Sequence, residues 1–123
     1  MTIQIDVDHQ RRLMEVRAEG EVRLKDVEAF LDTMIVETAL SYRKLIDSRN
    51  AEAKYIAADL VQLEARLTLY AHVDRRGAVA MVVDPKHVDL LDRLLQAGRP
   101  RRPACTFIDA AEAERWLARQ PEA

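Results

Sequence analysis

Cysteine, glycine and long apolar runs are scarce in this chain of 123 residues, and each shortage excludes a class of protein. The single cysteine, Cys105, excludes an intramolecular disulfide and a zinc site built from several cysteines. Three glycines are too few to form a glycine-rich phosphate-binding loop. No apolar run approaches the roughly 20 residues that cross a bilayer. The acidic N-terminal stretch MTIQIDVDH is also unlike a signal peptide.

The chain also carries almost no net charge. Lysine and arginine number 19 and aspartate and glutamate 21, which gives a net charge of −2. A general nucleic-acid binder is usually basic overall, so we expect no nucleic-acid partner. The length and the apolar content of 49% suit one domain with one core. We expect this domain to span residues 1–123 and to be cytoplasmic.

Two periodicities alternate along the chain and predict the order of its strands and helices. Alternating apolar and polar residues predict strands over 3–8 and 13–19, joined as an antiparallel hairpin that Gly20 ends. The later signals predict a helix over 24–36, a strand ending at Asp47 and Ser48, a loop from Arg49, a helix from residue 57 or 58, a strand over 78–83, a helix over 88–97, a strand over 104–108 and a helix from Asp109 to about Arg119. The order β-β-α-β-α-β-α-β-α predicts a single α/β domain, whose mostly parallel sheet has an antiparallel N-terminal edge strand.

Four stretches resemble a known family: IQIDVDHQRRLMEVRAEGEV, KDVEAFLDTMI, KLIDSRNAEAKYIAADLVQLEARL and TFIDAAEAERWL. Together they are similar to the STAS superfamily, and most closely to its stand-alone bacterial STAS/Sec14-like branch, which is related to anti-sigma-factor antagonists. The resemblance implies strands laid side by side in chain order and a domain that binds a protein partner.

One position departs from the antagonists that this family includes. Their loop before the second helix holds an Asp-Ser pair whose serine is phosphorylated, and the aligned pair here is Ile56-Ala57. The resemblance therefore implies a non-enzymatic regulatory or scaffold module that lacks the phosphorylatable serine. The alternative is a carrier or sensor of a small apolar, lipid-like ligand or of an anionic one.

Few residues suggest catalysis or metal binding. Ser48 and His87, with Asp47 or Asp84, could form a nucleophile with its base and orienting carboxylate. Helix capping and turn formation explain these side chains more simply, and a sheet in simple strand order has no crevice at a reversal point. The three histidines are scattered, and Cys105 lies in an apolar strand where packing explains it. We therefore expect no catalytic site, no metal and no cofactor.

Basic residues gather in the links that lead into parallel strands. Because these links meet at one edge of the sheet, they predict a basic edge that binds an anion or a protein partner. Its members are Arg75, Arg76, Arg99, Arg101 and Arg102. The alternative explanation is that these arginines only complement the negative ends of helix dipoles.

An apolar surface is the last prediction. Strands in chain order place the crossover helices on one face, so the other face, with Met81 and Val83, needs a cover. A homodimer is the simplest cover. The carrier alternative instead places an apolar ligand between the first two helices and the sheet, against Phe30, Met34, Leu60 and Tyr70.

Overall fold

The computed structural model describes residues 2–36, 41–71 and 77–121 of the chain. Its strands are β1 (Thr2–Asp8), β2 (Leu13–Val22), β3 (Arg43–Ala53), β4 (Val79–Val82) and β5 (Ala104–Phe107). Its helices are α1 (Leu24–Val36), α2 (Ala57–Tyr70), α3 (Val88–Leu95) and α4 (Ala110–Ala118), with a single 3₁₀ turn, η1 (Pro85–His87), before α3. The order of elements agrees with the predicted one.

The five strands form one mixed sheet in the order β1-β2-β3-β4-β5. β1 pairs with β2 in antiparallel fashion, and each later pair is parallel. The predicted α/β fold, with its antiparallel edge strand and its strands in chain order, is therefore confirmed.

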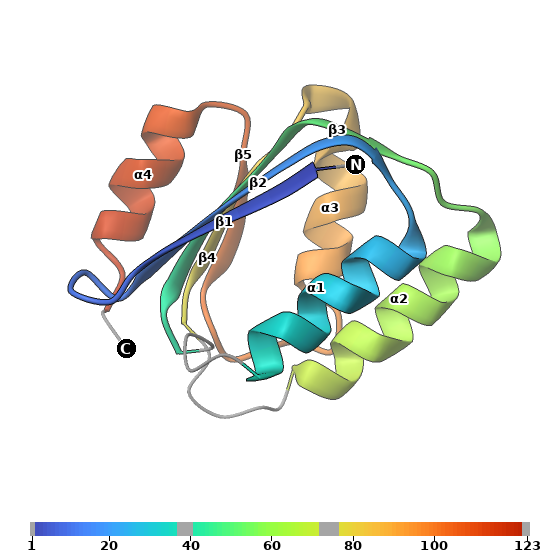
Figure 1. Ribbon diagram of the computed structural model, residues 1–123, viewed down its shortest axis with the longest axis horizontal. Coiled ribbons are helices and arrows are strands. Elements are labelled where there is room, and N and C mark those ends of the chain that lie inside the picture. Colours follow the sequence, from blue (N-terminus) through green and yellow to red (C-terminus); the bar gives the residue numbers. More distant parts are fainter. Residues whose placement is uncertain (1, 37–40, 72–76, 122–123) are drawn as a thin grey trace.

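Helices cover both faces of the sheet. Figure 1 shows α1, α2 and α3 on one face and α4 on the other. Apolar side chains of the sheet pack against α4 in a core on that face. Its buried residues are Leu13, Ala78, Ala80, Val82, Ala113 and Leu117. The prediction that this face lacks a cover within the chain is wrong. α4 follows the last strand and makes no crossover, so it is free to fold back onto the face that α1–α3 leave open.

The position of Met81 corrects the same prediction, because its side chain lies on the α1–α3 face. Val83 is fully buried. These two residues therefore do not form an exposed surface for a second copy. The homodimer stays a prediction, and Met81 and Val83 do not support it.

β2 and β3 are longer than predicted. β2 continues through Gly20, which adopts a φ of 81°, and β3 replaces the loop expected after Ser48. The parallel pairing of the two strands extends to Val22 and Ala53, whereas β3 pairs with β4 only over 44–47. The ends of β2 and β3 therefore form a two-stranded ribbon, which curves beyond the sheet towards α1 and α2 (Figure 1).

An irregularity in the pairing marks the start of this ribbon. The register shifts between Arg17 and Glu19, so Ala18 faces two residues of β3, Ser48 and Arg49. An extra residue of this kind bends a strand and increases its twist. Beyond this bend the ribbon turns towards the face of the sheet that carries α1, α2 and α3.

Local capping agrees with the sequence. The Asp109 carboxylate accepts a hydrogen bond from the Ala111 N–H at 3.0 Å, as predicted for the residue before α4. Asp59 lies in the first turn of α2, and its carboxylate accepts a hydrogen bond at 3.0 Å from the N–H of Ile56, the residue before the helix. Gly98 follows α3 with a φ of 74°, the conformation that favours glycine at a helix end.

Candidate ligand-binding site

A hollow lies between the sheet and helices α1, α2 and α3. α1 and α2 both begin near the far end of the ribbon, and α2 contacts both α1 and α3, while α3 also contacts β5. The space beneath them is a cavity of about 200 Å³.

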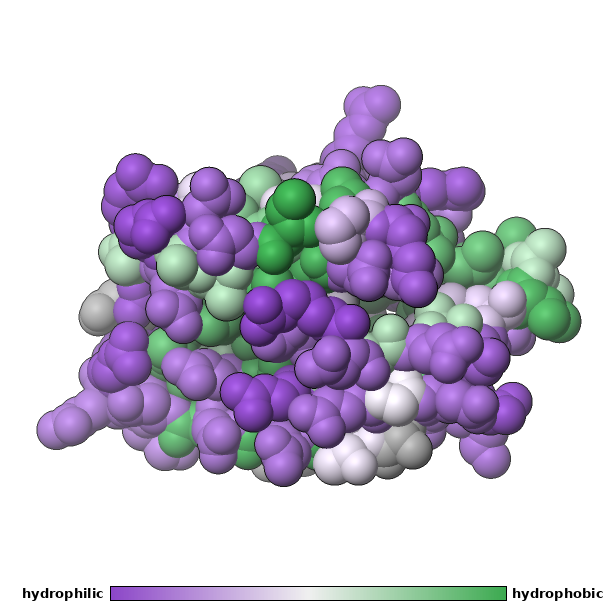
Figure 2. Space-filling model, turned by 90° about the horizontal axis from the view of Figure 1, so that it is seen from above, coloured by the Kyte–Doolittle hydropathy of each residue, from purple (hydrophilic) through white to green (hydrophobic). Residues whose placement is uncertain are grey.

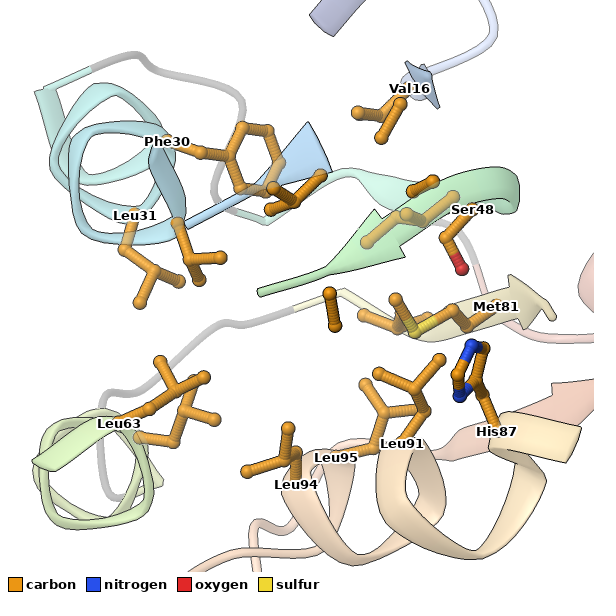
Figure 3. A pocket seen from close by; sticks show the side chains of 18 of the residues that line it. Val16, Phe30, Leu31, Ser48, Leu63, Met81, His87, Leu91, Leu94 and Leu95 are labelled. Atoms are coloured by element: carbon orange, nitrogen blue, oxygen red, sulfur yellow. The ribbon is translucent and has the colours of Figure 1, made fainter. Parts of the chain in front are cut away.

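Apolar side chains form most of the cavity wall. Figure 3 shows them pointing inward from the three helices and from the sheet. They include Val16, Phe30, Leu31, Ile46, Leu63, Met81, Leu91, Leu94 and Leu95. Tyr55 also lines the cavity, and burial, aided by the charges of Asp26 and Asp59, raises its pKa to about 12. The wall is therefore suited to hydrocarbon groups.

An arginine holds α1 and α2 together over the cavity. The Arg66 guanidinium donates to the Glu28 carboxylate at 2.7 Å and also to the Asp32 carboxylate, both of which belong to α1. It also donates to the Tyr70 hydroxyl at 3.2 Å, one helical turn along α2. These contacts link α2 to α1.

One end of the cavity is cationic. Lys44, at the start of β3, is 3% exposed, and its Nζ donates to the Tyr42 carbonyl at 2.7 Å. Arg102, two residues before β5, lines the same cavity and has its Nε and Nη1 atoms buried. Both residues lie at the edge where the parallel strands begin. Arg43, the neighbour of Lys44, points to the opposite face and donates to the Leu117 carbonyl of α4 at 3.3 Å.

The other end of the cavity carries Ser48 and His87, which the sequence suggested as a nucleophile and its base. The Ser48 hydroxyl donates to the Val82 carbonyl at 3.2 Å, and no hydrogen bond joins it to His87. Asp84 accepts the Lys86 N–H at 3.0 Å and so caps the turn η1. Neither Ser48 nor Asp84 has the contact that a catalytic triad requires.

Asp47 is also engaged elsewhere. Its carboxylate binds the Arg49 guanidinium at 2.8 Å, and this hydrogen bond lowers the pKa of Asp47 below its usual value. The carboxylate is therefore held by Arg49 and does not orient His87. Capping, strand and ion-pair contacts thus explain Ser48, Asp47 and Asp84.

The structure brings together only part of the apolar set predicted to hold a ligand. Phe30 lines the cavity, whereas Leu60 and Tyr70 are not among its wall residues. The Met34 side chain falls outside the described part of the chain. The wall residues that the prediction missed come mainly from the strands and from α3. Their alternation and helical spacing mark them as inward-facing residues but do not distinguish a cavity wall from a closed core.

The described residues include three of the five arginines of the predicted basic edge. Arg99 and Arg101 are exposed, while Arg102 turns into the cavity wall. Arg75 and Arg76 lie outside the described residues. Of the five arginines, the structure therefore connects Arg102 to the cavity and places two others on the outer surface.

Other kinds of site find little support. Within residues 2–36, 41–71 and 77–121, no three histidine, cysteine, aspartate or glutamate side chains come together as metal ligands. Burial raises the pKa of the Cys105 thiol, which opposes the thiolate form that a nucleophile needs. The helices in these ranges are all too short or too polar to traverse a bilayer.

The surface near the start of α2 is apolar. Ile56, which directly precedes this helix, is 68% exposed, and Val61 in the N-terminal half of the helix is also exposed. Figure 2 shows hydrophobic side chains protruding at the same end of an otherwise largely hydrophilic surface. In the alignment that the family resemblance implies, Ile56-Ala57 takes the place of an Asp-Ser pair, with Ala57 in the position of the serine.

Comparison with known proteins agrees with this architecture. A crystal structure of an uncharacterised protein of the DUF3478 family from Shewanella loihica PV-4, described as having a SpoIIAA-like fold, matches with a TM-score of 0.58. The match covers 94% of this chain and 92% of that one, at 20% sequence identity, and so supports the fold alone. No curated protein matches the chain. The SpoIIAA-like family model matches residues 13–118, and the chain therefore belongs to the SpoIIAA-like family.

Proposed function

We propose that this chain is a non-enzymatic domain that binds a small apolar ligand between its sheet and helices α1–α3, as a carrier or a sensor. The observation that carries the proposal is the cavity of about 200 Å³ with its mostly aliphatic wall. An apolar cavity of about 150 Å³ in another protein accommodates benzene. The cavity therefore suits a hydrocarbon group somewhat larger than benzene.

The energy available from such a wall is substantial. Each methylene group that a ligand buries contributes about 0.8 kcal/mol, so six contribute on the order of 5 kcal/mol. The loss of translational and rotational freedom offsets part of this gain. A net gain below about 5 kcal/mol corresponds to millimolar or weaker affinity for a short hydrocarbon chain.

Native mass spectrometry of protein purified gently from its expression host tests the proposal directly. Added mass that disappears on denaturation identifies a bound ligand. A calorimetric titration with toluene, a neutral probe slightly larger than benzene, then measures the affinity of the ligand-free protein. Saturable binding supports the proposal, and the absence of both added mass and probe binding contradicts it.

A pair of substitutions locates the probe. Leu91→Asn places a polar amide in the cavity wall, whereas Leu69→Asn makes the same change at a side chain that is 77% exposed. Leu91→Asn is expected to weaken probe binding at least tenfold, and Leu69→Asn to leave it unchanged. Equal effects of the two substitutions would place the probe outside the cavity. Circular dichroism confirms that each variant is folded.

A second candidate function is binding of a protein partner without a phosphorylation switch, and the exposed Ile56 favours it. An apolar side chain at the start of α2 is suited to an apolar surface of a partner protein. A phosphoserine at the same place would instead require a partner with basic side chains. Affinity capture with the wild type, Ile56→Asp and Ile108→Asp tests this idea, since Ile108 is 54% exposed at a different site. A partner lost only by Ile56→Asp supports it, and a partner retained by all three proteins contradicts docking at α2.

A further inference from the structure

Two neutral polar side chains lie at one end of the mostly apolar cavity. Ser48 belongs to β3 and His87 to the turn before α3, and both residues line the cavity and are half-buried. Figure 3 shows the Ser48 hydroxyl pointing towards the side on which the His87 ring lies. This end of the cavity can therefore form hydrogen bonds that the aliphatic wall cannot.

We infer that the ligand is a small neutral alcohol, whose hydrocarbon part fills the cavity and whose hydroxyl group lies between Ser48 and His87. This inference rests on the proposed function and specifies the chemistry of the ligand. A pure hydrocarbon would use the same wall but would gain nothing from these two polar side chains.

The hydrogen bond that Ser48 already makes determines what this residue can offer a ligand. A hydroxyl group has one proton to donate and two lone pairs that accept. The Ser48 proton is donated to the Val82 carbonyl at 3.2 Å, so its remaining capacity is that of an acceptor. A ligand group that binds Ser48 must therefore donate a hydrogen bond, which a hydroxyl group can do and a carboxylate or ketone cannot.

His87 provides the complementary capacity. Its ring nitrogens form no hydrogen bond with the part of the chain that the structure describes. A neutral imidazole has one N–H donor and one acceptor nitrogen. A ligand hydroxyl can thus accept a hydrogen bond from His87 while it donates one to Ser48, so both of its hydrogen-bonding functions are satisfied.

The rest of the wall disfavours an ammonium group, which is another strong donor. No aspartate or glutamate within residues 2–36, 41–71 and 77–121 lines the cavity, so an ammonium group would be buried there without a counter-charge. Tyr55 supplies another hydroxyl group to the wall, from the chain between β3 and α2. A variant of Tyr55 can therefore distinguish this position from the end that carries Ser48 and His87.

Benzyl alcohol and ethylbenzene are suitable probes for the inference. They are slightly larger than benzene, as the cavity requires, and they differ only in a hydroxyl group that replaces a methyl group. A hydroxyl group buried without hydrogen bonds should weaken binding roughly tenfold to a hundredfold. Hydrogen bonds with Ser48 and His87 should remove this penalty.

NMR chemical-shift titrations of the isotope-labelled wild-type protein measure both affinities at about pH 8, where imidazole groups are largely neutral. Benzyl alcohol is expected to bind at least as tightly as ethylbenzene. Weaker binding of benzyl alcohol than of ethylbenzene would overturn the inference and leave the proposed function intact. Failure of both compounds to bind would overturn both.

Three variants locate the hydroxyl group of the ligand. Ser48→Ala removes the acceptor and His87→Phe keeps a ring without nitrogens, while Tyr55→Phe removes a different hydroxyl group from the same wall as a matched control. The affinity for benzyl alcohol relative to ethylbenzene is expected to fall about threefold to tenfold in Ser48→Ala and in His87→Phe, and to stay at the wild-type value in Tyr55→Phe. An unchanged ratio in both Ser48→Ala and His87→Phe would overturn the placement. If either variant fails to fold, the comparison of the two compounds on the wild type still decides whether the cavity favours an alcohol.

Discussion

Enlarging Ala18 would fill the cavity from the sheet side. Ala18 lies on β2 at the irregularity opposite Ser48 and Arg49, and its methyl group lines the cavity. Ala18→Leu adds three carbon atoms at this point. The added atoms would enter the space that the proposed ligand occupies, so this one substitution tests both the cavity and its use.

The expected magnitude follows from the apolar surface buried. Three carbons at about 0.8 kcal/mol each set an upper limit of about 2.4 kcal/mol on the gain in stability of the ligand-free protein. Imperfect packing reduces this gain, so an increase of about 1–2 kcal/mol in the free energy of unfolding is expected. A ligand deprived of the same space should bind at least about tenfold more weakly.

Urea denaturation and probe titration measure the two effects on the same ligand-free sample. Ala65→Leu is the matched control, because it makes the same change at an exposed position of α2. Its free energy of unfolding should stay within about 0.5 kcal/mol of the wild type, and its probe affinity should not change. If Ala18→Leu lowers stability while probe affinity stays at the wild-type value, the space does not exist as described and the reasoning is refuted.

Three further predictions concern the frame of the cavity. Arg66→Ala is expected to lower the free energy of unfolding and to alter ligand affinity, because its carboxylate partners belong to α1. Arg66→Lys should restore only part of the loss, since lysine has no planar fork, and full rescue in urea denaturation would contradict this explanation. Gly77→Ala is expected to destabilise by about 1–3 kcal/mol, because a Cβ atom there would lie 2.1 Å from the Tyr42 carbonyl oxygen. A melting temperature equal to that of the wild type would contradict this prediction and would show that the backbone shifts to make room for the Cβ atom. Burial raises the pKa of Tyr55 to about 12, so the folded protein keeps a proton that the unfolded chain releases near pH 10. Stability should therefore fall between about pH 10 and pH 12, and Tyr55→Phe should remove that part of the decline in denaturation measured against pH.

The sequence by itself determined the order and type of the elements, because those signals are local. Alternation and helical spacing describe which side chains face inward within a short segment, whatever lies opposite. Asp109 and Gly98 mark helix ends for the same reason, since a cap is formed with neighbouring backbone groups. The strand order was also accessible, since it follows from the order of elements and from the family resemblance.

The length of β3 was decided only by tertiary structure. Its second half, RNAEA, has no strand-like alternation, and it is extended because β2 pairs with it. The same holds for α4, whose apolar side could pack on either face of the sheet. The opposite orientations of Arg43 and Lys44 follow from strand geometry, but which of them meets a cavity depends on where the helices lie.

The cavity itself also belongs to the tertiary structure. Leucines such as Leu63, Leu91 and Leu94 have the same spacing whether their helices touch the sheet or stand away from it. α1 and α2 begin near the far end of the β2–β3 ribbon, whose bend arises from pairing between residues far apart in the chain. The sequence thus specified which side chains are apolar and inward-facing, and only the folded arrangement left space between them, because that space depends on non-local backbone pairing.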